Sequence, residues 1–168
     1  QEKSVEIFKS LLEKHIRMCK DELLERFKHI ASQSPRSAVF MYENHTMAGY
    51  HENEGIISAL KDGTIVIGQL GVAEALLIMF GYDHTTPEGL ERAREIEKLY
   101  FDRCAEFKAK EGIAVATYGT PAESLCGTQV KQFRKMFGIV DGVSDKEYFN
   151  NSFHVNVDAD INPFQKQD

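Results

Sequence analysis

The chain has 168 residues, 42% apolar and 27% charged, a balance typical of one folded globular domain rather than of a disordered segment. Its formal charge of -6 argues against a general nucleic-acid or membrane-surface role, because those contacts depend on clustered Lys and Arg. The sequence contains no apolar run long enough to span a bilayer, and no charged-then-apolar leader opens it. A cytoplasmic protein that binds neither nucleic acid nor membrane is therefore expected.

The first predicted element is one long amphipathic helix. Apolar residues recur every three or four positions from Val5 to Ile30, which predicts a helix over residues 2–31. The run SQSPRS breaks this pattern, and the apolar stretch 38–42 is predicted to form a short strand. Residues 43–55 are rich in polar side chains and are expected to be mostly loop.

Two later segments share one local pattern, in which a short apolar strand leads through a glycine turn into a helix. In the segment 61–81 the strand TIVI precedes the turn GQLG, and in the segment 113–138 the strand IAVA precedes TYGTPAES. A long helix that opens at Thr85-Thr86-Pro87-Glu88 lies between them and ends near Gly112. Strands separated by helices favour parallel pairing and an α/β architecture.

The TPAES run has the residues of a helix start. Thr120 is predicted to be the N-cap, Pro121 the first helical residue and Glu123 the third, which together would form a capping box. The amide groups at such a start, helped by the positive end of the helix dipole, can also hold a phosphate or a carboxylate. From these residues alone, a helix cap without a ligand is the commoner interpretation.

Other polar residues give weaker indications. Glu74 is predicted to be a buried or interface carboxylate with a partner, His84 a surface histidine and His154 a satisfied interior one. The three cysteines form no C-x-x-C pair and are expected to be unpaired. A polar cluster has the residue types of a metal site, but a solvated loop is the favoured interpretation; its members are Glu43, His45, His51, Glu52 and Glu54.

Three segments together carry a resemblance to a known family. They are KDGTIVIGQLGVAEALLIMFG (61–81), TYGTPAESLCGTQVKQFRKMFG (117–138) and GVSDKEYFNNSFHV (142–155). In order and spacing they resemble the anaerobic, class III ribonucleoside-triphosphate reductase large subunit. This resemblance implies a glycyl-radical enzyme that reduces ribonucleoside triphosphates to deoxyribonucleoside triphosphates under anaerobic conditions, for deoxyribonucleotide biosynthesis, inside a ten-stranded α/β barrel.

The resemblance also implies that residues 1–168 are a single internal fragment of the catalytic barrel domain, a helix-rich partial barrel that is inactive alone. The family's finger-loop cysteine, its R-x-x-G-Y radical glycine and its two zinc-binding C-x-x-C pairs are not found in the sequence, so no catalytic residue, metal ligand or cofactor is assigned here. The glycyl radical, zinc and a formate or thiol reductant are expected in the full-length enzyme. Its expected partners are the remainder of the same chain, a radical SAM activase and a second copy.

By the same resemblance, the TPAES segment holds the substrate's phosphates through backbone amides, with Pro121 contributing shape only. The implied phosphate-binding residues are Thr120, Pro121, Ala122, Glu123 and Ser124, and Tyr118 and Gly119 are candidates for the edge of the substrate cavity. Two alternatives remain. One is a stand-alone phosphate- or nucleotide-binding α/β module without catalysis, and the other is a helical interaction or scaffold protein based on the first 31 residues.

Overall fold

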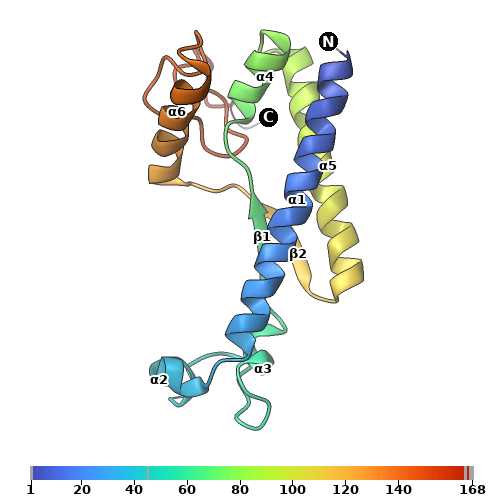
Figure 1. Cartoon of the computed structure of the whole chain (residues 1–168), viewed down its shortest axis with the longest axis vertical. Helices are drawn as coiled ribbons and strands as arrows, with labels where there is room; N and C mark the ends of the chain where they lie inside the picture. The colour runs from blue at the N-terminus through green and yellow to red at the C-terminus, as the bar shows by residue number, and fades with distance from the viewer. Residues whose placement is uncertain (1, 45, 165, 167–168) are drawn as a thin grey trace. The chain divides into compact units, whose positions relative to one another are not determined.

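The computed structural model describes residues 2–44, 46–164 and 166 as helices with one small sheet (Figure 1). The chain divides into two compact units. Unit 1 comprises Gln1–Ser10, Gly68–Tyr100 and Tyr118–Asp168, and unit 2 comprises Leu11–Ile67 and Phe101–Thr117. The elements in chain order are α1 (Glu2–Ala31), the 3-10 helix η1 (Pro35–Ala38), α2 (Val39–Tyr42), α3 (Ile57–Leu60), β1 (Thr64–Gly68), α4 (Val72–Phe80), α5 (Pro87–Glu111), β2 (Ala114–Tyr118) and α6 (Glu123–Phe137).

Most of the small sheet belongs to unit 2, where β1 and β2 pair in parallel. Along β1 burial alternates, so that Ile65 and Ile67 are buried while Val66 is 46% exposed. Strands of parallel sheets are usually covered on both faces. In this chain β1 is covered on one face, and the mixed α/β character expected from the sequence is present as a two-stranded sheet.

Charged side chains join the α1 and α5 stretches of unit 2. Glu106 accepts hydrogen bonds from Arg17 at 3.1 Å and Lys110 at 2.7 Å, and also from Arg103. These donors hold the pKa of Glu106 well below its usual range. Phe107 is buried beside them, with the Arg17 guanidinium 5.6 Å from its ring centre. The periodicity that predicted a helix over residues 2–31 is confirmed by α1.

The prediction of a strand over residues 38–42 is wrong, because this stretch forms the last residue of η1 and the whole of α2. Ser34 caps η1 by accepting the Arg36 amide at 3.3 Å, and Pro35 has the fixed backbone angle that suits a first helical position. Tyr42 is then buried against Tyr50, with ring centres 5.0 Å apart. Local helix-start chemistry therefore outweighs the apolar run.

Unit 1 is built from α4, α6, part of α5 and the irregular chain after α6. Its core includes Leu76 of α4 and Val130 of α6, both fully buried, and Val143 from the irregular segment. The stretch 152–157 forms turns and loop. Within the described residues, no helix combines the length and apolar content needed to cross a membrane.

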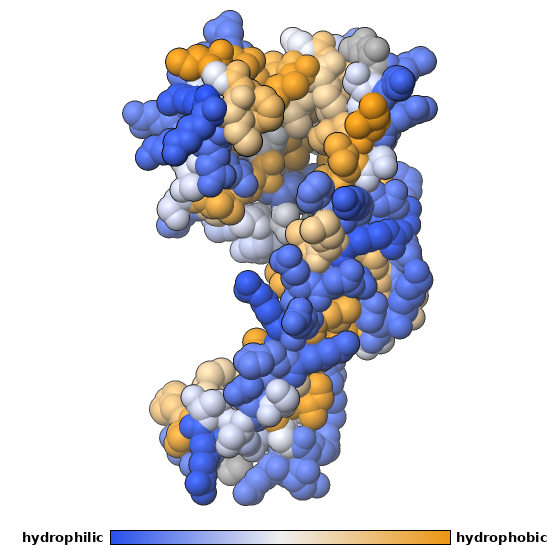
Figure 2. Space-filling view, viewed as in Figure 1, coloured by the Kyte–Doolittle hydropathy of each residue, from blue (hydrophilic) through white to orange (hydrophobic). Residues whose placement is uncertain are grey.

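Large apolar side chains remain on the surface of both units. In unit 1 they gather at the end of α6, where Met136, Phe137 and Ile139 are each at least 65% exposed (Figure 2). In unit 2, Phe40 of α2 is 72% exposed. Exposed apolar patches of this kind are typical of interaction surfaces.

Candidate functional site

The two strand–turn–helix segments meet where their strands end. A Cβ atom on Gly68, the last residue of β1, would overlap Oγ1 of Thr120 and lie 3.2 Å from the carbonyl oxygen of Tyr118. Only glycine therefore fits at position 68 without movement of its neighbours. The turns after β1 and β2 thus lie together at the carboxyl edge of the sheet, the edge where open α/β sheets bind ligands.

The turn after β1 is filled by the chain itself. Gly71 adopts a left-handed conformation with φ of 74° just before α4. Its amide donates to the carbonyl of Asn150 at 3.0 Å, and the amide of Val72 donates to the carbonyl of Ser152 at 3.4 Å. The loop around residues 149–153 therefore occupies the place where an anion could meet the first amides of α4.

Glu74 fixes this loop in position. Its side chain is buried, and Oε1 accepts the Asn150 backbone amide at 2.9 Å and Asn150 Nδ2 at 2.7 Å. The ammonium group of Lys146 lies 2.6 Å from the same oxygen. The expectation of a buried carboxylate with a partner is confirmed, and the ion pair compensates a charge that would otherwise be costly to bury.

The turn after β2 differs from the predicted capping box. The helix α6 begins at Glu123 rather than at Pro121, and the residue before it, Ala122, is left-handed with φ of 34° and ψ of 40°. No side chain caps this helix, and Thr120 turns to contact Gly68 instead. By contrast, Thr86 does cap α5, because its Oγ1 accepts the Gly89 amide at 3.0 Å.

The start of α6 presents open hydrogen-bond donors. The amides of Leu125 and Cys126 donate back to the carbonyl of Ala122 at 3.0 and 3.2 Å. Among the residues that the structure describes, the amides of Glu123 and Ser124 have no acceptor, and both residues are exposed. The first turn of a helix carries a partial positive charge. These two amides can therefore donate hydrogen bonds to an anion from outside the chain.

Comparison with known proteins identifies the family of the chain. The family model for anaerobic ribonucleoside-triphosphate reductase matches residues 1–168. The chain belongs to this family.

Curated relatives carry the same family name. The chain is 29% identical over 166 residues to the anaerobic ribonucleoside-triphosphate reductase of Escherichia coli, with 96% of this chain and 23% of that protein covered. It is 27% identical over 175 residues to the Haemophilus influenzae enzyme, with coverage of 100% and 24%. For the Enterobacteria phage T4 enzyme the identity is 27% over 169 residues, with coverage of 99% and 26%. The chain thus spans about a quarter of the length of these relatives.

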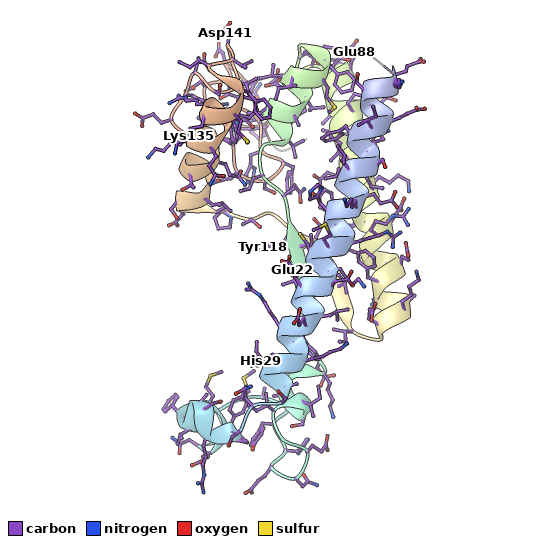
Figure 3. The ribbon with its side chains drawn as sticks, in the orientation of Figure 1. Glu22, His29, Glu88, Tyr118, Lys135 and Asp141 are labelled. Carbon is purple, nitrogen blue, oxygen red and sulfur yellow. The ribbon has the colours of Figure 1, made fainter. Side chains whose placement is uncertain are left out.

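The residues expected at the edge of a reductase cavity lie beside the open helix start. Tyr118 ends β2 and is 52% exposed (Figure 3). A Cβ on Gly119 would lie 3.6 Å from Oγ of Ser152 and 3.5 Å from the Phe153 ring, so the same loop that fills the first turn borders the second. Tyr118, Gly119 and the TPAES segment are consecutive in sequence and connect the end of β2 to the first turn of α6.

Two histidines differ from their sequence interpretation. His84 was expected at the surface, but both of its ring nitrogens are buried. Burial lowers the pKa of His84, against the opposing charges of Asp83 and Glu74. His154 was expected inside and is exposed. The burial of these two histidines could not be predicted from their neighbours in sequence, because it depends on how the loop that carries His154 packs on α4.

The described part of the chain contains free cysteines and no cluster of metal-ligating side chains. No group of three or more metal-ligating side chains occurs there, and His45 of the loop cluster lies outside the described residues. Cys126 is buried and donates to Oδ1 of Asn151 at 2.9 Å, and burial raises the pKa of its thiol. The residues present do not fit the family's zinc or glycyl-radical sites.

Sequence reasoning missed the loop that builds this site. Lys146 and Asn150 lie more than seventy positions from Glu74, and no local pattern announces their pairing with it. The available signal was the apolar spacing of α4, which placed Glu74 in the buried part of the helix. A buried carboxylate requires a partner, although the spacing could not say which one.

Proposed function

We propose that this chain forms part of the catalytic subunit of an anaerobic ribonucleoside-triphosphate reductase, which reduces ribonucleoside triphosphates to deoxyribonucleoside triphosphates by glycyl and thiyl radical chemistry. Its role is to supply barrel wall and the phosphate-binding start of α6. One observation carries the second part: among the described residues the amides of Glu123 and Ser124 are both open, whereas the 149–153 loop accepts the amides of Gly71 and Val72 at the start of α4.

The chemistry of the open turn suits a triphosphate. Backbone amides at a helix start donate hydrogen bonds to phosphate oxygens, and the helix dipole adds a favourable charge. Pro121 has no amide hydrogen and sets the shape of the turn. Ala122 adopts its left-handed conformation directly before the two open amides, and both residues that carry them are exposed. Thr120 and Gly119 border the site through their contacts with Gly68 and the 149–153 loop.

The barrel proposal rests on the small sheet. Within the described residues β1 and β2 each have only the other strand as a neighbour, and β1 leaves Val66 exposed. Further strands from the rest of the same protein would complete a ten-stranded α/β barrel by pairing with these edges and covering their outer face. In this proposal the rest of the same protein also covers the exposed apolar side chains of α6 and α2.

The remaining parts of the reductase are assigned outside this chain. The glycyl radical, zinc, the formate or thiol reductant, a radical SAM activase and a homodimer belong to the proposed full-length enzyme, and the chain is expected to be inactive alone. A stand-alone phosphate-binding module is not favoured, because the family match extends over all 168 residues. The cytoplasmic location stays a prediction.

The phosphate site is tested with two variants of nearly equal shape, Ala122→Asp and Ala122→Asn, in the full-length reductase. Both side chains tolerate the left-handed conformation of Ala122. The carboxylate adds a negative charge beside the phosphate position, so the Michaelis constant for the ribonucleoside triphosphate should rise about tenfold, the equivalent of ~1.4 kcal/mol.

Steady-state kinetics at two salt concentrations measures this effect, because added salt weakens a purely electrostatic penalty. The Asn variant is the control for size and should remain within about twofold of the natural protein. Equal Michaelis constants for the Asp and Asn variants would remove the phosphate role from this turn.

A further inference from the structure

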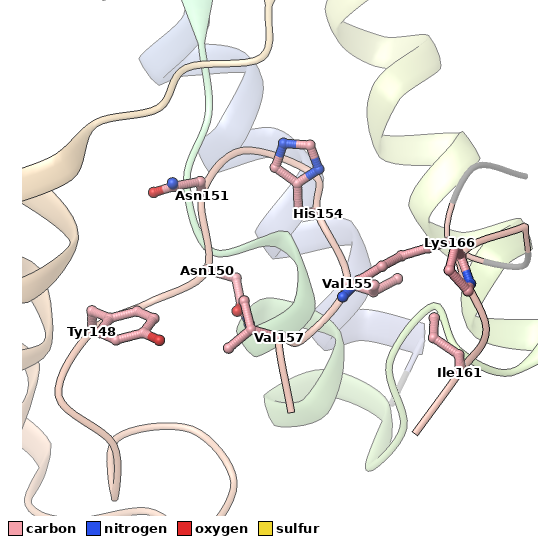
Figure 4. Close-up of a pocket in the computed structure, with 9 residues that line it drawn as sticks. Tyr148, Asn150, Asn151, His154, Val155, Val157, Ile161 and Lys166 are labelled. Atoms are coloured by element: carbon pink, nitrogen blue, oxygen red, sulfur yellow. The ribbon is translucent and has the colours of Figure 1, made fainter. Parts of the chain in front are cut away.

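A cavity of about 590 Å³ lies in unit 1, within the chain that follows α6 (Figure 4). Its walls are partly apolar, with Val155, Val157 and Ile161, and its polar side chains include Tyr148, Asn150 and His154. Binding sites for small organic ligands have this composition, in which apolar walls surround a few placed polar groups. The cavity is large enough to hold a sugar or a base.

One polar group in the wall is set in a fixed orientation. Asn150 is 2% exposed, and its Nδ2 donates to Glu74 Oε1 at 2.7 Å. The opposite orientation would place the carboxamide oxygen against a carboxylate, and two acceptors cannot share a hydrogen bond. The ion pair between Glu74 and Lys146 keeps that carboxylate available as an acceptor. Oδ1 of Asn150 must therefore point away from Glu74.

This oxygen has no donor within the described part of the chain, although it is buried. Buried carboxamide oxygens are nearly always hydrogen-bonded, so an unpaired one in a residue that lines a cavity is a candidate acceptor for a donor from a ligand. The oxygen is a neutral acceptor, and it suits a hydroxyl group. Neighbouring Asn151 differs, because its Oδ1 already accepts the thiol of Cys126.

The cavity wall is tied directly to the start of α6. The Phe149 amide donates to the carbonyl of Cys126 at 3.4 Å, and Cys126 in turn donates to Asn151 at 2.9 Å. Cys126 stands in the first turn of the helix whose amides are proposed to bind phosphate. A nucleotide links its phosphates to its sugar through one carbon atom, so both groups can be held by adjoining parts of unit 1.

We infer that Asn150 contacts the substrate, its Oδ1 accepting a hydrogen bond from a ribose hydroxyl of the nucleotide, and that Glu74 is the positioning residue that orients its carboxamide. The inference rests on the proposed function, because it takes the ribonucleoside triphosphate as the ligand. It adds the sugar to the part of the substrate that this chain recognises.

The first test changes the ligand and leaves the protein intact. Calorimetry on the full-length reductase compares a ribonucleoside triphosphate with its 2′-deoxy and 3′-deoxy analogues and with tripolyphosphate. Loss of the hydroxyl that Asn150 contacts should weaken binding roughly tenfold, the size expected for one hydrogen bond to a buried acceptor. Equal affinity for all three nucleotides would overturn the inference without requiring any variant to fold.

The second test repeats the series with Asn150→Ala. The substitution should weaken the ribonucleotide roughly tenfold and the analogue lacking the contacted hydroxyl by less than about twofold, because the two changes remove the same hydrogen bond. Affinity for tripolyphosphate should not change. Equal weakening of all three nucleotides would show that Asn150 acts only through the fold, and it would reject the contact.

Two further variants complete the design. Asn156→Ala removes an asparagine outside the cavity whose Oδ1 accepts the Asp158 amide, and it should bind every ligand as the natural protein does. Glu74→Gln should weaken the ribonucleotide while sparing the analogue, the pattern of a positioning residue. Failure of the phosphate proposal would appear separately, as tripolyphosphate that does not compete, and it would leave the hydroxyl comparison intact.

Discussion

The segments 61–81 and 113–138 have the same local plan but different surroundings. After β1, carbonyl groups of the 149–153 loop accept the amides of Gly71 and Val72 at the start of α4, and Glu74 in the first turn of this helix is buried. After β2, the same loop stops beside Gly119 and leaves the amides of Glu123 and Ser124 open. A helix start becomes a candidate binding site when the rest of the chain leaves its donors unfilled. The residues of the start alone do not decide this.

The two Thr-Pro sequences extend the comparison. Thr86 precedes Pro87 and caps α5, whereas Thr120 precedes Pro121 and caps no helix. The difference arises because Thr120 lies against Gly68, where the two strand ends meet. A tertiary contact has redirected a side chain whose local sequence favours a cap.

The largest expected effect comes from filling the place where the two turns meet. Gly68→Ala would force a methyl group into Thr120, so the free energy of unfolding should fall by about 1–3 kcal/mol, the usual cost of overpacking. Thr120→Ala added to this variant removes the overlapping hydroxyl and should restore part of the loss. Chemical denaturation of the 168-residue chain measures both.

Gly127→Ala is the matched control, since a methyl group there would meet only the Glu147 carbonyl at 3.7 Å, an ordinary contact. It lies in α6, where alanine is a better helix former than glycine. If Gly68→Ala were tolerated as well as Gly127→Ala, the two turns would not be packed together.

A smaller effect should separate the two threonines. Thr86→Ala removes a helix cap and should lower the free energy of unfolding by about 1 kcal/mol. Thr120→Ala removes no cap and should cost less than about half of that, since it loses only the side-chain contact with Gly68. Thermal unfolding of the paired variants gives the comparison, and an equal loss from both would mean that Thr120 caps α6 after all.

The smallest effect concerns pH. Burial lowers the pKa of His84 below its ordinary value of 6.5, so the folded chain favours the neutral ring. This contribution to stability is complete above pH 6.5 and is lost as the pH falls from 6.5 through the lower folded pKa. The free energy of unfolding of the natural sequence should therefore decrease over that interval.

His84→Gln removes the titrating ring and should flatten the curve between pH 7 and 5, while His154→Gln, at an exposed position, should leave its slope unchanged. Denaturation at several pH values checks both. Parallel curves for the natural protein and the His84 variant would mean that the burial of His84 does not contribute to the pH dependence of stability.

Much of the architecture was predictable from local sequence. The apolar period of three to four residues marked α1, and β-branched runs before glycine marked β1 and the turn into α4. Gly81 and Gly138 are the C-caps of α4 and α6, at the ends of the two predicted strand–turn–helix segments. The family resemblance, carried by three ordered segments, is also a property of the sequence. These features succeed because hydrophobic period and glycine conformation act within a few residues.

Only the tertiary structure decided which polar groups of the candidate site are left without a partner. The start of α6 moved from Pro121 to Glu123 because Thr120 packs on Gly68, and Asn150 acquired its open oxygen because Glu74 holds its amide. Both contacts join residues more than fifty positions apart, and hydrogen bonding across such distances leaves no period in the sequence. Local chemistry therefore supplied the helix starts, and long-range packing determined which of them stayed open.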